Sequence, residues 1–221
     1  MQAHYRTDYP GEFVILNTTF KGGKKIQERE WIENPIQNQH ISGRAAAIGS
    51  DIDNHKWFDY RVLENHRGGL LGSKKLQTYG TATIARDMRL DFAVDTDYNN
   101  LAPLVVNKYT ENNVVYTTAR NCISDPGEFY LIPQSPNFCT TVFPIYLAAF
   151  DGHKEIYMIG YTRELDGGQS DWIHQVTEII RAYSGTKFIM VGNQYNMPDE
   201  WMSCANTGNL TQRDFVTYCD V

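Results

Sequence analysis

Apolar residues show their clearest pattern between Cys139 and Tyr161, where they predict a helix followed by a buried strand. In the first half of this stretch they recur at intervals of three and four, the spacing of one helix face, at Val142, Ile145, Tyr146, Ala149 and Phe150. The almost continuously apolar run 155–159 then indicates a strand covered on both faces, which is typical of a parallel sheet flanked by helices. The pattern therefore predicts an α/β protein.

Other apolar runs, bounded by glycine, asparagine, aspartate or proline, predict the remaining strands of this sheet. They span residues 44–48, 59–64, 90–94, 113–116, 128–132 and 187–191. The mixed stretch 70–88 predicts no single helix, because Gly72 and Gly80 interrupt it. A further helix is expected to begin at Ser170 or Asp171, since either side chain can cap the apolar face that follows.

The N-terminal segment predicts a separate β-hairpin. Two β-rich segments, 12–16 and 25–31, flank Lys21-Gly22-Gly23-Lys24, whose glycines suit a tight turn. We therefore expect three parts. They are a hairpin and linker over 1–40, a Rossmann-like core with helices on both faces of a mostly parallel sheet over 41–195, and an irregular tail over 196–221, with one short helix near 211–217, packed on the core.

Charge and composition narrow the classes of protein. The 221 residues carry a net charge of -6 with both signs interspersed, which argues against binding to nucleic acid through a basic surface. No apolar run approaches the length of a membrane span, and the first residues lack the apolar core of a signal peptide, so we expect a cytoplasmic protein. The four cysteines are far apart, which favours reduced thiols over disulfides or a zinc site.

Glycines and polar residues follow most of the predicted strands. Ligands of open parallel sheets bind outside the carboxyl ends of the strands, so these residues are candidates for a binding site. The candidates are Gly49, Ser50, Asn65, His66, Arg67, Asp95, Asp97, Arg120 and Tyr161. Carboxylates such as Asp95 and Asp97 suit Mg²⁺ or Mn²⁺, while His66 with Arg67 offers a base and an anion donor. Ordinary turns are the alternative interpretation of Gly49-Ser50 and His66-Arg67, and His174, on a half-buried helix, has a structural alternative to a role as general base.

Three stretches, in the same order, resemble the bacterial sialyltransferases of the Campylobacter type and the related motility-accessory-factor proteins. They are Ala45 to Ser50, Leu90-Asp-Phe-Ala-Val-Asp-Thr-Asp97 and Ala148-Ala-Phe-Asp-Gly-His-Lys-Glu-Ile-Tyr-Met-Ile-Gly160. The resemblance implies a Rossmann-like glycosyltransferase with a nucleotide donor at the strand ends. It implies Gly49 and Ser50 near the donor phosphate, Asp97 near the nucleotide or sugar, Thr140 and Thr141 before the helix, Tyr161 at the lip, and His174 roughly where the family has its catalytic histidine.

We therefore expect a protein that binds a nucleotide-sugar donor and transfers the sugar to a hydroxyl acceptor. His174 or His66 would take the acceptor proton, while backbone N–H groups near Gly49 and a guanidinium, Arg67 or Arg120, meet the charge of the leaving nucleotide. The resemblance implies no required cofactor, so a cation on Asp95 and Asp97 is optional. Two alternatives remain: a non-catalytic α/β module whose N-terminal hairpin docks on a protein partner, and a nucleotide-dependent enzyme of another reaction type.

Overall fold

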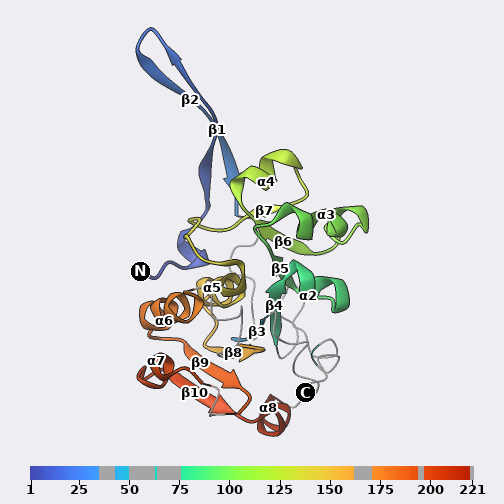
Figure 1. Cartoon of the computed structure of the whole chain (residues 1–221), viewed down its shortest axis with the longest axis vertical. Helices are drawn as coiled ribbons and strands as arrows, with labels where there is room; N and C mark the ends of the chain where they lie inside the picture. Colours follow the sequence, from blue (N-terminus) through green and yellow to red (C-terminus); the bar gives the residue numbers. More distant parts are fainter. Residues whose placement is uncertain (35–42, 50–62, 64–75, 162–170, 194–196, 220–221) are drawn as a thin grey trace.

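The computed structural model of the chain describes residues 1–34, 43–49, 63, 76–161, 171–193 and 197–219 (Figure 1). Within these ranges eight strands form one parallel sheet, and two more form an antiparallel hairpin. The strands of the large sheet are β3 (Arg44–Ile48), β4 (Gln77–Thr81), β5 (Phe92–Val94), β6 (Val114–Thr117), β7 (Tyr130–Leu131), β8 (Glu155–Ile159), β9 (Lys187–Val191) and β10 (Thr207–Leu210). The fold is therefore a Rossmann-like α/β fold, as the sequence predicts.

The order of strands across the sheet is β10-β9-β8-β3-β4-β5-β6-β7. The chain starts at β3, adds β4 to β7 on one side, and then returns to place β8, β9 and β10 on the other side. The direction of winding therefore reverses between β3 and β8. In open α/β sheets such a reversal opens a crevice at the carboxyl ends of the two strands, where ligands bind.

Helices cover both faces of the sheet because side chains along each strand alternate between two cores. Ala45 and Ala47 of β3 face α5 (Phe143–Phe150) and α6 (Trp172–Ala182), whereas Ala46 and Ile48 face α2 (Ala82–Asp87), α3 (Tyr98–Val106) and α8 (Gln212–Cys219). Two short helices, α4 (Ala119–Ser124) and α7 (Asp199–Met202), and the 3-10 turn η3 (Thr140–Val142) complete the described helical elements of the core. None of the described helices is long and apolar enough to span a membrane.

Every residue of α5 is buried, which its sequence FPIYLAAF explains: a helix that is apolar all round must be covered on all sides. The sheet covers one side. The N-terminal segment, including the 3-10 turn η1 (Arg6–Asp8), covers the C-terminal end of α5, where the ring of Tyr9 meets Phe150 edge-on at 5.5 Å. The N-terminal segment is thus part of the core packing.

The predicted hairpin is present and longer than its sequence pattern indicates. Strands β1 (Gly11–Lys21) and β2 (Lys24–Glu33) pair antiparallel and project away from the core (Figure 1). Gly22 and Gly23 form the turn with φ angles of +57° and +74°, which glycine adopts without steric cost.

The structure corrects two sequence predictions. Of the strand predicted over 59–64, only Leu63 is described, and it is helical; the neighbour of β3 is β4, in a stretch for which no strand was predicted. Gly80 suits β4 because a Cβ there would lie 2.8 Å from Leu90 Cδ1. The tail is also not irregular. It contains α7 and β10, and β10 extends the sheet by pairing with β9, while the short helix predicted near 211–217 is confirmed as α8.

Candidate functional site at the carboxyl edge of the sheet

An open cavity of about 530 Å³ lies where β5 and β6 end, between the first turn of α3 and the short helix α4. Its lining comes from the loops that follow the two strands and from both helices: Thr96, Asp97, Tyr98, Thr118, Arg120, Asn121, Ser124 and Asp125. Asp97 and Arg120, predicted as ligand contacts from widely separated stretches, therefore lie in one cavity. The cavity lies on the carboxyl edge of the sheet, where ligands of open α/β sheets bind, but beside β5 and β6 rather than at the reversal between β3 and β8.

Asp97 shapes the cavity by capping α3. Its carboxylate accepts hydrogen bonds from the backbone N–H of Asn99 at 3.0 Å and from the Asn99 side chain at 3.1 Å. The N–H of Asp97 in turn donates to Asp95 Oδ1 at 2.9 Å. Asp95 is 2 % exposed, and its burial raises the pKa of its carboxyl group. The buried Asp95 carboxylate therefore stabilises the loop after β5, whereas Asp97 is exposed and faces the cavity.

The hydrogen bonds of Asp95 and Asp97 concern the divalent cation that the sequence predicts as optional at these two residues. Asp95 and Asp97 each bind backbone N–H groups, which are the contacts of a structural loop and a helix cap. Within the described ranges, no group of three or more histidine, cysteine, aspartate or glutamate side chains could hold a metal ion. The optional cation on this pair stays a prediction from the sequence, and the function proposed below does not depend on it.

Arg120 supplies the positive charge of the cavity. It is exposed, and its guanidinium has no hydrogen-bond or ion-pair partner among the described residues. Tyr98, which is 41 % exposed, and Asp125 lie in the same lining, and a hydrogen bond to the Asp125 carboxylate raises the pKa of the Tyr98 hydroxyl. Asn121 donates to Thr96 O at 3.2 Å and so ties the loop after β5 to α4. A cation, an aromatic ring, two acids and several hydroxyls therefore line one space.

Hydrogen bonds continue from this cavity along the carboxyl edge to β8. The hydroxyls of Thr96 and Thr140 lie 2.6 Å apart, and the hydroxyl of Tyr161 donates to Thr141 O at 3.0 Å. Tyr161 itself is only 1 % exposed, and burial raises the pKa of its hydroxyl well above the ordinary value. The resemblance places Tyr161 at the lip of the site. The structure corrects this, because the Tyr161 side chain is buried and binds the backbone of Thr141.

Gly49 marks the reversal point between β3 and β8. Its N–H donates to Ile159 O at 2.7 Å, and a Cβ at this position would lie 2.7 Å from the carbonyl oxygen of Gly160. Gly160 has a φ of +76°, in the left-handed region that glycine favours. The two backbones thus approach more closely than any side chain would allow. Gly49, Thr140, Thr141, Asp97 and Arg120 all lie along one edge of the sheet.

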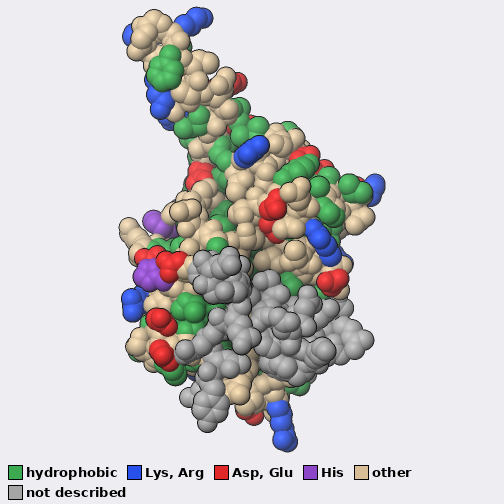
Figure 2. Space-filling model, viewed as in Figure 1, with side chains coloured by type: hydrophobic (Ala, Val, Ile, Leu, Met, Phe, Trp, Pro, Cys, Tyr) green, Lys and Arg blue, Asp and Glu red, His purple; other side chains and the backbone are tan. Residues whose placement is uncertain are grey.

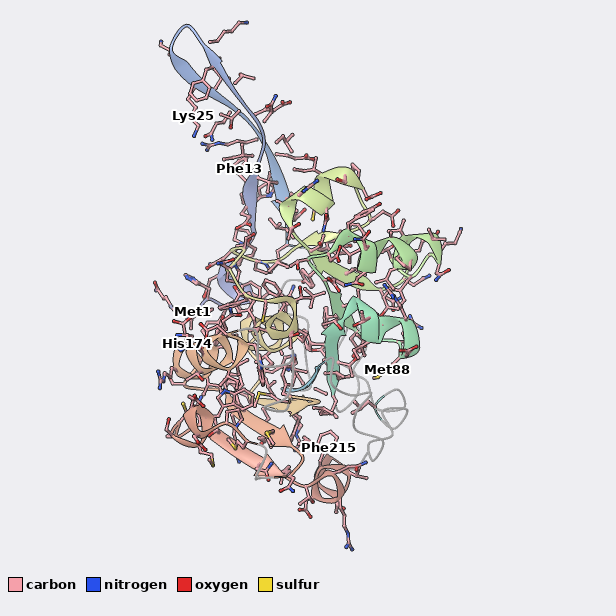
Figure 3. The ribbon with its side chains drawn as sticks, in the orientation of Figure 1. Met1, Phe13, Lys25, Met88, His174 and Phe215 are labelled. Carbon is pink, nitrogen blue, oxygen red and sulfur yellow. The ribbon has the colours of Figure 1, made fainter. Side chains whose placement is uncertain are left out.

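Of the two candidate bases, the structure describes His174 but not His66. His174 is exposed on the outer side of α6 and does not line the cavity (Figure 3). The structure therefore does not bring His174 together with Asp97 and Arg120. His66 lies outside the described residues, as do Ser50, Asn65 and Arg67, and these four stay predictions from the sequence.

Six of the eight lining residues are not among the candidates predicted from the sequence, and three of these, Tyr98, Ser124 and Asp125, lie beyond the strand ends altogether. Tyr98 belongs to α3, Ser124 belongs to α4, and Asp125 directly follows α4. The pattern of apolar residues reveals neither of these two helices. Pro103 inside α3 obscures the helical pattern, and α4 spans only six residues. The capping potential of Asp97 before Tyr98 is the signal that could have indicated α3.

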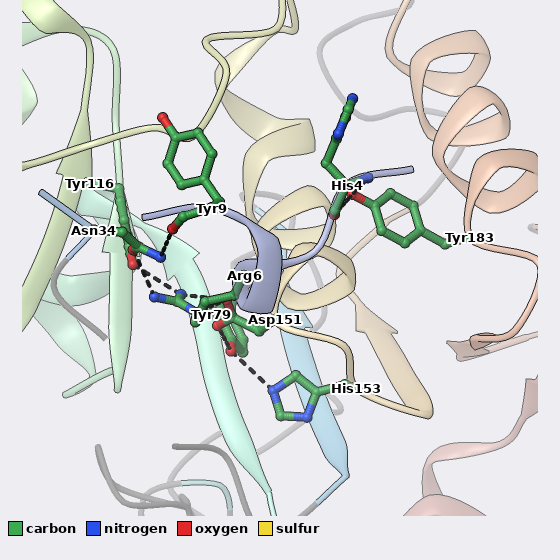
Figure 4. Close-up of polar contacts among 9 residues, drawn as sticks. All are labelled: His4, Arg6, Tyr9, Asn34, Tyr79, Tyr116, Asp151, His153 and Tyr183. Atoms are coloured by element: carbon green, nitrogen blue, oxygen red, sulfur yellow. Dashed lines mark hydrogen bonds and ion pairs between the residues drawn. The ribbon is translucent and has the colours of Figure 1, made fainter. Parts of the chain in front are cut away.

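A second polar cluster, buried under the N-terminal segment, is the other candidate for chemistry (Figure 4). Arg6 is 1 % exposed and donates to Asp151 Oδ1 at 2.5 Å, to Asn34 Oδ1 at 3.1 Å and to the Tyr116 hydroxyl at 3.0 Å. Burial disfavours the charge of Arg6, but the attraction of Asp151 and neighbouring groups outweighs it, so the pKa of Arg6 is raised. Arg6 thus stays charged inside the core.

Tyr79 extends this cluster on the other side of Asp151. Its hydroxyl donates to Asp151 Oδ2 at 2.5 Å and lies 3.0 Å from His153 Nε2. Burial raises the pKa of Tyr79 well above the ordinary value, and the negative charge of Asp151 adds to the effect. Because these groups are buried away from solvent, we interpret the cluster as structural: its hydrogen bonds join the N-terminal segment to β4, β6 and the end of α5.

No family model matches the chain, and neither a curated protein nor a solved structure matches it. The resemblance to the bacterial sialyltransferases therefore stays a prediction from the residues.

Proposed function

We propose that this chain binds a nucleotide sugar at the carboxyl edge of its sheet and acts as a glycosyltransferase. The observation that carries the proposal is the cavity of about 530 Å³ in which Asp97 and Arg120 come together. Small-molecule sites typically enclose roughly 300 to 1,000 Å³ and contain a few polar groups that orient the ligand. The cytoplasm is the proposed location, where nucleotide sugars would be the available donors.

The side chains suggest a division of roles. Arg120 would bind a phosphate oxygen of the donor, since a guanidinium is a planar donor that stays charged. Asp97 would accept hydrogen bonds from sugar or ribose hydroxyls, and the ring of Tyr98 would pack on an apolar ring face. In the transfer step, the acceptor oxygen would attack the anomeric carbon as its bond to the phosphate oxygen breaks, and a base would take the hydroxyl proton.

The proposed base is His66 rather than His174, because the outward position of His174 does not suit contact with a ligand in the cavity. We expect His66→Ala to lower the rate of transfer or hydrolysis by about a hundredfold or more, with little change in donor affinity. His174→Ala is the matched control and should keep full activity. Loss of activity in the His174 variant alone would refute this assignment.

Binding is tested first, by thermal unfolding and calorimetry with a panel of nucleotides and nucleotide sugars, followed by hydrolysis assays with and without Mn²⁺. Arg120→Ala should weaken binding by about tenfold or more, since a charge-assisted contact to phosphate is lost. Arg181→Ala removes the same charge from the exposed end of α6 and should leave binding unchanged. Absence of any thermal shift and of any hydrolysis across the panel would end the proposal.

The hairpin favours a second candidate, a module that docks on a protein partner. Large apolar side chains are exposed along it, at Phe13, Ile15, Phe20, Ile26 and Trp31. Deleting residues 1–31 would also remove Arg6 from the core, so a cleaner variant joins Glu12 to Ile32, which pair in the hairpin, through two glycines. This variant should fold and bind nucleotide but lose the partner, whereas Asp97→Asn should keep it.

A further inference from the structure

The end of the hairpin stands clear of the rest of the described chain. Its strands pack against the core only at their base, through Val14 and Ile32, and every residue from 17 to 26 is exposed. At about 3.3 Å per residue the turn lies roughly 20 Å beyond Val14. Figure 1 shows the hairpin projecting along the longest axis of the molecule. The hairpin tip, defined here as residues 19–26, therefore reaches a flat surface before the described core does.

Positive charge is concentrated at the hairpin tip. Lys21, Lys24 and Lys25 are exposed there, and none of them forms an ion pair with a described residue (Figure 2). No acidic residue occurs between Glu12 and Glu28. The whole chain has a net charge of -6, so the residues outside the tip carry -9. Because the Debye length is about 8 Å at physiological ionic strength, a surface that touches the tip is screened from this negative charge of the core. The tip therefore suits an anionic surface.

Large apolar side chains lie on both faces of the hairpin tip. Phe20 is paired with Lys25 and Ile26 with Thr19, and successive pairs of an antiparallel ribbon point to opposite faces. Phe20 is 75 % exposed and Ile26 is 49 % exposed. A protein or a nucleic-acid strand bound to one face would leave one of these two side chains in water. The interfacial region of a lipid bilayer, by contrast, surrounds a tip that enters it and covers both side chains.

We propose that the hairpin tip binds the surface of a bilayer that contains anionic lipids. Phe20 and Ile26 enter the boundary between headgroups and acyl chains, while the long side chains of the lysines keep their ammonium groups at the level of the lipid phosphates. Only the tip enters, because the unpaired backbone groups along the edges of the ribbon need water, which the hydrocarbon lacks. Each lysine near an anionic membrane strengthens binding about fivefold. The association is weak and reversible, with half-saturation at roughly 0.1 to 1 mM lipid.

Membrane binding goes beyond the nucleotide site and does not rest on it. The test is flotation of the full chain with vesicles of phosphatidylcholine that contain about 30 % phosphatidylserine, at up to about 5 mM lipid; binding should be at least tenfold tighter than to phosphatidylcholine alone. Replacing Lys21, Lys24 and Lys25 together by glutamine should weaken binding by about a hundredfold, and higher salt should weaken it as well. The variant that joins Glu12 to Ile32 through two glycines lacks the tip and should not float with the vesicles.

Three serine variants distinguish a membrane from a partner that docks on one face of the hairpin. Phe20→Ser and Ile26→Ser should each weaken vesicle binding by about tenfold, because both side chains enter the bilayer. Phe13→Ser is the matched control: Phe13 is 62 % exposed on the same face as Phe20 but lies near the base (Figure 3), so its replacement should leave binding unchanged. Docking of one face on a protein, the second candidate function, predicts the reverse for Phe13 and Ile26.

Several outcomes would overturn the proposal of membrane binding. They are no flotation with anionic vesicles at any lipid concentration, equal binding to neutral vesicles, a loss in Phe13→Ser as large as in Phe20→Ser, or no loss in Ile26→Ser. Tighter binding to a single-stranded RNA oligonucleotide than to the vesicles, measured by fluorescence anisotropy, would overturn it as well. Arg120→Ala should float like the wild type, so failure of the nucleotide proposal is recognised separately.

Discussion

Replacing Arg6 by methionine is expected to lower the free energy of unfolding by about 3 to 5 kcal/mol, the cost of removing one partner of a buried ion pair. The pair qualifies because the side chains of Arg6 and Asp151 are 1 % and 2 % exposed, so little solvent screens them. Methionine fills much of the space of the arginine stem but leaves the Asp151 carboxylate buried with the Tyr79 hydroxyl as a remaining donor. For a domain of this size the change corresponds to a fall in melting temperature of roughly 6 to 20 °C.

The measurement is urea unfolding at neutral pH, followed by circular dichroism, for the wild type, Arg6→Met, Asp151→Leu and the double variant. Because two apolar residues can replace a buried pair at little cost, the double variant should be more stable than Arg6→Met alone. A loss below about 1 kcal/mol in Arg6→Met would refute the reasoning, since it would mean that water reaches the pair. A double variant less stable than both single variants would refute it as well.

Three further perturbations test the site and the core. Gly49→Ala should lose about 1 to 3 kcal/mol of stability because its Cβ would meet Gly160 O at 2.7 Å, whereas Gly185→Ala, with open space around it, should lose none; thermal unfolding compares them. Asp97→Ala should lower the free energy of unfolding by about 1 kcal/mol, because it removes the cap of α3. Asp97→Asn should keep the cap, so weaker ligand binding in this variant would show that the negative charge contributes to binding. Burial raises the pKa of Tyr116 from 10.0 to about 12, so its contribution to stability is complete below pH 10 and is lost as the pH rises from about 10 to 12; at 1.36 kcal/mol per pH unit this is about 3 kcal/mol. Unfolding free energies from pH 8 to 12 should fall less steeply in Tyr116→Phe, and equal slopes would contradict this assignment.

Periodicity predicted those elements whose burial follows from their own side chains. The apolar run of β8 predicts a buried strand, and Gly22 and Gly23 predict a tight turn, from local sequence alone. The structure confirms both predictions. The pattern did not reveal β4, where Gln77-Thr-Tyr-Gly-Thr81 is buried throughout although it contains polar residues. Thr78 finds its partner only in the folded chain, where it accepts a hydrogen bond from Asp91 and donates to it. Strand β10 escaped prediction because an edge strand needs no apolar run.

The sequence by itself determined the α/β class, the hairpin and the polar character of the strand ends, because each depends on the order of residues within one short segment. Only the tertiary structure decided which strand ends share a cavity. Asp97 and Arg120 meet because β5 and β6 are neighbours in the sheet, and Arg6 finds Asp151 across 145 residues of chain because α5 ends beneath the N-terminal segment. Contacts of this kind depend on packing among distant segments, which local patterns of residues do not encode.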